Sequence, residues 1–111
     1  MVYSDTEVIR RLFHLDAKGA LEWCRDDNGG FIAEINGTRI RLCCQTLDRT
    51  RDGVVLTLIN PLTGASGSLS EPHEKEGRLL RDDMRELFYR VEKKAVSHED
   101  LWQKLAVKLF N

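Results

Sequence analysis

Three histidines are the side chains in this sequence best suited to bind a metal or move a proton. They are His14, His73 and His98, and none belongs to a His-x-x-x-His or Cys-x-x-Cys pair that would direct two ligands to one ion. His73 stands beside Glu74 and Glu76, but the proline and glycine that flank this cluster favour a solvated loop. We therefore predict no metal site and no bound cofactor.

The candidate nucleophiles have no partner groups at the spacing that catalysis needs. Cys43 and Cys44 are neighbours on a predicted strand, so they point to opposite faces and suit neither a disulfide framework nor a metal clip. The segment at 64–68, Gly-Ala-Ser-Gly-Ser, lacks the strand-turn-helix setting and the placed base of a nucleophile loop. We expect no catalytic residue, and we lean towards a protein that is not an enzyme.

Arginine is the charged residue type that gathers most clearly along the strands. Arg39 and Arg41 alternate on one predicted strand, and Arg49 and Arg51 follow in the next loop. Guanidinium groups on a sheet and its loop can follow the phosphates of a nucleic acid. Acidic residues are mixed with them, however, and the formal net charge of the chain is -1. Binding of nucleic acid through these four arginines is therefore the alternative hypothesis, not the leading one.

The clearest structural signal is a hairpin over 31–42. Asn36-Gly37 is the dipeptide that best tolerates the positive φ of a two-residue type I′ turn. Closing the hairpin there places Glu34 opposite Arg39, a pair of opposite charge. Side chains alternate along a strand, so the apolar residues of both arms share one face, which should be buried. These residues are Phe31, Ala33, Ile35, Ile40 and Leu42.

Helices are predicted on both sides of the strands. Ser4 to Glu7 and Ser97 to Asp100 match capping boxes, and apolar residues follow each at helical spacing. These signals predict helices at about 5–17 and 98–110, and periodicity alone predicts another at about 77–95.

Strands are predicted at about 20–25, 31–35, 38–47 and 54–59. The segments at 48–53 and 61–75 are expected to be loops, the second of them mobile, with a weak signal for an edge strand at 66–70. A three- or five-residue loop after the first strand would place Trp23 opposite Ala33, on the core face, and we prefer it because it buries the largest side chain.

Grouped strands followed by grouped helices indicate the α+β class rather than a parallel sheet. We expect one domain over residues 1–111, a four-stranded antiparallel meander with one N-terminal and two C-terminal helices. At least the C-terminal pair of helices should pack on the core face. That face is predicted to carry Leu21, Trp23, Phe31, Ile35, Ile40, Leu42, Leu56 and Leu58.

The opposite, outer face of the sheet mixes aliphatic groups with arginine, a combination typical of protein interfaces. The fourth strand is apolar on both sides, which a water-facing antiparallel strand would not be. We expect this face to bind a protein partner or a second copy of the chain as a homodimer. The alternative is that the N-terminal helix or the long loop covers it. The candidate residues are Ile32, Arg39, Arg41, Val55, Thr57 and Ile59.

The composition is that of a soluble globular protein, with 41% hydrophobic and 32% charged residues. No apolar run approaches the roughly 18 residues of a membrane span, and the first residues lack the pattern of a secretory signal. Together with the odd number of cysteines, this predicts a cytoplasmic protein without a membrane partner.

Overall fold

The computed structural model of the protein describes residues 2–49 and 51–110. Over these residues the chain forms one antiparallel sheet of five strands, in the order β1-β2-β3-β4-β5, and three α-helices. The α+β class is confirmed, with one strand more than the four predicted. The elements are α1 (Asp5–Ala17), β1 (Cys24–Arg25), β2 (Phe31–Ile35), β3 (Thr38–Asp48), β4 (Arg51–Ile59), β5 (Ser66–Ser70), a 3-10 turn (Lys75–Gly77), α2 (Arg78–Lys94) and α3 (His98–Leu109).

The β2–β3 hairpin has the predicted turn and register. Asn36 has φ 51 and Gly37 has φ 74, the two positive values that a type I′ turn requires. Glu34 pairs with Arg39 across the ladder, and the Arg39 Nε lies 2.8 Å from the Glu34 Oε1. The predicted core face is buried, because Phe31 and Leu42 on this hairpin are 5% and 0% exposed.

The first strand is shorter than predicted, although its register is the one expected. Cys24 pairs with Ile32 and Arg25 with Phe31. The loop between the two strands therefore has five residues, at 26–30, which is one of the two expected lengths. Trp23 is buried, but its carbonyl accepts from the backbone N–H of Val96 (3.2 Å), and the Arg25 N–H donates to the Val96 carbonyl (2.9 Å). The segment that joins α2 to α3 therefore occupies the free edge of β1.

Two segments predicted as loops belong to the sheet. β3 and β4 stay paired up to Asp48 and Arg51, with a bulge between Thr46 and Asp48, so the prediction of a loop at 48–53 is wrong at 48 and 51–53, and position 50 lies outside the described residues. Polar cross-strand contacts support this ribbon, among them a hydrogen bond of 3.0 Å between the Thr46 hydroxyl and Asp52.

The prediction of a mobile loop over 61–75 is also wrong where β5 forms. The weak signal for an edge strand at 66–70 is confirmed, because Ser66–Ser70 pairs antiparallel with β4. Leu69 lies opposite Leu56 and packs against the core, while the Thr57 and Ser68 hydroxyls are hydrogen-bonded at 2.9 Å. One apolar contact and a complete ladder thus compensate for a strand that is otherwise small and polar.

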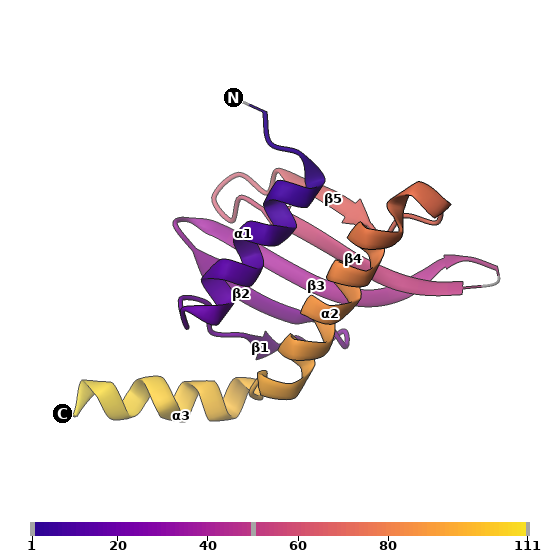
Figure 1. The fold of residues 1–111 in the computed structure, drawn as a ribbon. Coiled ribbons are helices and arrows are strands. Elements are labelled where there is room, and N and C mark those ends of the chain that lie inside the picture. The colour runs from indigo at the N-terminus through magenta and orange to yellow at the C-terminus, as the bar shows by residue number, and fades with distance from the viewer. Residues whose placement is uncertain (1, 50, 111) are drawn as a thin grey trace.

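Helices α1 and α2 lie together across one face of the sheet (Figure 1). Their stripes of apolar residues meet the predicted core face, since Ile9 and Leu12 of α1 and Met84, Leu87 and Val91 of α2 are 0–4% exposed. The layers are therefore one helical layer on one sheet, and the opposite sheet face carries neither α1 nor α2.

Helix α3 does not join the helical layer, so the prediction that the two C-terminal helices pack together on the core face is wrong. It meets the sheet chiefly beside β1 and extends past it (Figure 1), and none of its described residues belongs to the buried core. The reason is that α1 and α2 already fill the layer, while Val96 ties the linker to the edge of β1. The radius of gyration is 14.9 Å, against about 13 Å for a compact chain of this length.

Candidate functional site

Two rows of partly accessible side chains run across the strands on the outer face of the sheet. One row contains Ile32, Arg41, Thr57 and Ser68, and the next contains Glu34, Arg39, Ile59 and Ser66. The alternative that the N-terminal helix or the long loop covers this face is wrong. Helix α1 packs on the core face, and the middle of the loop segment extends the sheet as β5.

The predicted binding residues lie on this face with different accessibility. Ile32, Arg39, Arg41, Thr57 and Ile59 are half-buried, so part of each side chain is accessible to solvent.

Val55 has to be removed from the predicted contact set, because it is only 4% exposed. Its short side chain lies on an interior strand, opposite Cys43 on β3 and Ser70 on β5. Cys43 is itself 5% exposed, and its Sγ lies 3.9 Å from the Gln45 Oε1. The apolar side chain that β4 places on the outer face at Val55 is therefore buried within the protein itself and is not part of the accessible surface.

The two arginines of β3 are engaged by carboxylates. Arg39 pairs with Glu34, and the Arg41 Nε lies 2.7 Å from the Asp26 Oδ2. Asp26 also accepts from the backbone N–H groups of Asn28 (2.9 Å) and Gly30 (2.7 Å), which closes the five-residue loop. Burial alone would raise the pKa of Asp26, but these hydrogen bonds and the Arg41 charge hold that pKa below its usual value.

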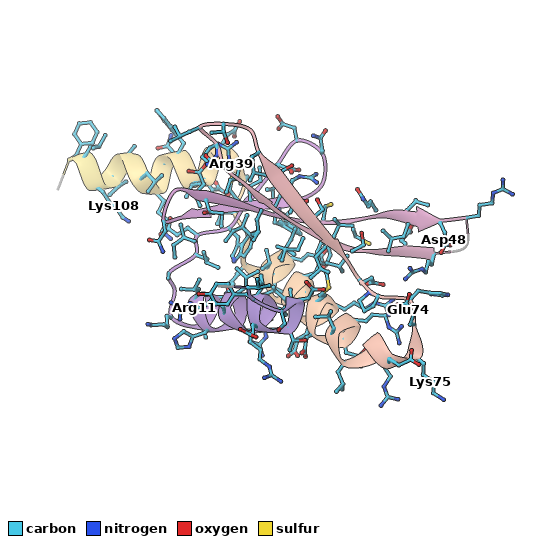
Figure 2. The ribbon with its side chains drawn as sticks, turned by 90° about the horizontal axis from the view of Figure 1, so that it is seen from above. Arg11, Arg39, Asp48, Glu74, Lys75 and Lys108 are labelled. Carbon is cyan, nitrogen blue, oxygen red and sulfur yellow. The ribbon has the colours of Figure 1, made fainter. Side chains whose placement is uncertain are left out.

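The arginines of the nucleic-acid alternative do not form one patch. The Arg51 guanidinium lies 3.1 Å from Asp48 and 3.9 Å from Glu71, and Arg49 is exposed at the far turn. The ten positions between Arg39 and Arg49 correspond to roughly 30 Å of strand. Figure 2 shows Arg39 and Asp48 towards opposite ends of the sheet. A phosphate backbone would meet pairs of neutralised charges rather than a continuous basic surface.

Two of the three thiols, those of Cys24 and Cys44, are poorly suited to act as nucleophiles. Burial raises the pKa of Cys24, and the nearby carboxylates Asp26 and Asp27 raise it further. Burial also raises the pKa of Cys44, as do the charges of Asp52 and Glu71.

No group of histidine, cysteine or acidic side chains within residues 2–49 and 51–110 is arranged to hold a metal ion. Over the same residues, no helix is both long enough and apolar enough to span a bilayer.

A groove of ≈ 800 Å³ lies where the outer face meets α3. Its floor includes Cys24, Ile32 and Arg39, and Leu101 and Leu105 of α3 form a wall. This half of the site is not predictable from the sequence pattern, because apolar spacing in a helix does not tell whether the apolar side meets the core. The short linker at 95–97 was the available signal, since it leaves little chain to turn α3 back onto α2.

Helix α3 presents large apolar side chains to solvent. Trp102 is 66% exposed, Leu109 is 83% exposed and Phe110, just after the helix, is 88% exposed. These exposed aromatic and aliphatic groups lie on the helix that borders the arginine-bearing face of the sheet.

Comparison with known proteins gives no match, since no family model, no curated protein and no solved structure matches this chain.

Proposed function

We propose that this chain is a protein-interaction module without catalytic activity, which acts through the outer face of its sheet. The observation that carries the proposal is the asymmetry of the sheet. Helices α1 and α2 cover one face of the sheet. On the opposite face, Ile32 and Ile59 are half-buried and are not covered by α1 or α2.

The chemistry of the outer face supports binding to protein. Aliphatic side chains there alternate with arginine, and arginine is enriched at interfaces whereas lysine is depleted. Arg39 and Arg41 already face Glu34 and Asp26. A partner can therefore cover these charges without leaving any of them buried and unpaired, which would be costly.

We propose the cytoplasm as the location of this module. Cys24, Cys43 and Cys44 are all free thiols, and thiols persist in a reducing compartment.

Photo-crosslinking in cells tests the proposed face. A photoreactive amino acid in place of Ile59 or Thr57 probes the outer face, and one in place of His14 or Leu79 probes exposed positions of the helical layer. We expect discrete protein adducts, including adducts with a second copy, from the outer-face positions only. Equal labelling from both layers, or no adduct from the outer face, would refute the proposal.

A pair of matched variants tests whether contacts on the outer face contribute to the binding free energy. Ile59→Asp places a charge on the proposed face, and Leu79→Asp places the same charge on α2, where Leu79 is 74% exposed. Only Ile59→Asp should abolish the adducts formed from Thr57, while circular dichroism shows that both variants keep the fold.

A further inference from the structure

Helix α3 has more apolar surface than its own sheet covers. Leu101, Leu105 and Leu109 recur every four residues, with Trp102 beside them, so they form one stripe. Leu101 and Leu105 line the groove, whereas Trp102 and Leu109 are 66% and 83% exposed. Val107 lies on the other side of the helix, about 180° from the centre of the stripe at 100° per residue.

Helix α3 packs against little of the described chain. It has 12 residues and meets the sheet chiefly beside β1. Isolated helices of roughly 12–15 residues are marginal in water, because most helical stability comes from packing of an apolar face. Figure 2 shows α3, with Lys108 labelled, extending past the end of the sheet, away from α1 and α2.

The charges of the groove and the helix are complementary. Five carboxylates line the groove, those of Glu22, Asp26, Asp27, Glu34 and Glu99. They outnumber the nearby cations, which are Arg25 and Arg39 in the lining and the ion-pair partners Arg41 and Lys104. Beyond Asp100, α3 carries lysines and no acid. The groove thus has one more acid than nearby cations, and it suits an apolar helix whose last turn carries Lys108, since Lys104 is already paired with Glu22.

We infer that the occupant of this groove is α3 of a second copy, in a symmetric dimer where each α3 lies in the groove of the other. This inference rests on the proposed function and names the partner of the same face. One chain carries both complementary surfaces, so a two-fold axis satisfies them twice and closes the assembly. The stripe of Trp102 and Leu109 enters the groove over Ile32, and Lys108 reaches its acidic rim.

Size-exclusion chromatography with light scattering, over a range of concentrations, tests the stoichiometry. The wild type should approach twice its 12.8 kDa chain mass. Trp102→Asp and Leu109→Asp should each raise the dissociation constant by about thirtyfold or more, as for the central residues of an interface. Val107→Asp, the matched control on the same helix, should leave it unchanged. A monomer at every concentration, or a dimer equally affected by all three variants, overturns the inference.

Disulfide trapping tests the geometry with the native thiol in the groove. In a background of Cys43→Ala and Cys44→Ser, mild oxidation of a Leu109→Cys variant should join that position to Cys24 of another copy. Val107→Cys should give no such product, and neither should Leu109→Cys once Cys24→Ser is added. Equal trapping from Val107→Cys, or none from Leu109→Cys, contradicts the proposed arrangement.

The two proposals fail in different experiments. If the purified chain is monomeric while position 59 still forms adducts with another protein in cells, the dimer is refuted and the proposed function stands. If the chain dimerises and these variants have no effect, and position 59 gives no adduct, both are refuted.

Discussion

The Arg85 guanidinium donates to the Glu71 carboxylate from two nitrogens, with distances of 2.7 Å from Nη2 to Oε1 and 3.1 Å from Nε to Oε2. The Glu71 side chain is 0% exposed, and it also accepts from the backbone N–H of Val54 at 3.1 Å. This pair fastens α2 to β4 and to the chain just after β5, on the core face. It holds in place the strands whose opposite side forms the proposed interaction surface.

Removal of Arg85 should destabilise the fold, because a buried carboxylate would lose its main partner. We expect Arg85→Met to lower the free energy of unfolding by about 2–3 kcal/mol, less than for a fully buried pair, because Arg85 is 54% exposed. Arg90→Met removes the exposed pair with Glu86 and should cost at most about 0.5 kcal/mol. Urea denaturation measures both, and equal losses would show that burial of the pair is unimportant.

Stability should fall in acid through Glu71. Burial would raise its pKa, but the hydrogen bonds from Arg85 and Val54 and the charge of Arg51 hold that pKa below its usual value. A folded-state pKa below that of the unfolded chain gives stability that is present above about pH 4.5 and is lost as pH falls through the folded value. The pKa of Asp26 is also below its usual value, so Asp26 likewise contributes stability that is lost in acid.

The acid effect can be measured as unfolding free energies at pH 7, 5, 4 and 3. Glu71→Gln should be less stable than the wild type at pH 7, and the difference should shrink as the pH falls. A constant difference across this range would exclude titration of Glu71 as a cause.

Asp16 should contribute to stability through Trp23. The Trp23 indole N–H donates to the Asp16 carboxylate at 3.1 Å, and Lys94 of α2 pairs with the same oxygen. Asp16→Ala leaves a buried donor unpaired and should cost about 1–3 kcal/mol, whereas Asp16→Asn keeps an acceptor and should cost less. Thermal unfolding followed by near-UV circular dichroism checks the order of the two variants.

The hairpin turn should be sensitive to its first residue. Asn36 has φ 51, a conformation that disfavours most side chains by roughly 1–2 kcal/mol. Asn36→Ala should therefore destabilise the fold by about 1 kcal/mol, while Asn36→Gly should be close to neutral. If both variants match the wild type in urea denaturation, the type I′ turn does not set the register.

Oligonucleotides should not bind tightly. Arg39, Arg41 and Arg51 are paired with carboxylates, so few phosphate contacts are open to them. We expect no binding of single-stranded or duplex oligonucleotides by fluorescence anisotropy, even at low salt, where phosphate contacts are strongest. Binding that weakens steeply with salt, and is lost in a variant with Arg39→Ala and Arg49→Ala, would favour the nucleic-acid alternative.

Local chemistry by itself determined much of this protein. Asn36-Gly37 specified the hairpin and therefore which side chains share the core face, and the register followed from alternation. The capping boxes were also readable, since the Ser4 and Ser97 hydroxyls accept from the backbone N–H of Glu7 and Asp100. The turn and the helix caps depend on residues only a few positions apart, so they can be predicted from the local sequence.

Only the tertiary structure decided what depends on distant neighbours. β5 forms because β4 offers backbone hydrogen bonds and Leu69 packs opposite Leu56, and the 4% exposure of Val55 depends on the folded chain around it. Helix α3 has the same periodicity as a core helix, but Val96 binds the edge of β1 and sends it past the sheet. Periodicity tells which side of a helix is apolar, whereas the contacts that cover that side come from elsewhere in the chain or from another molecule.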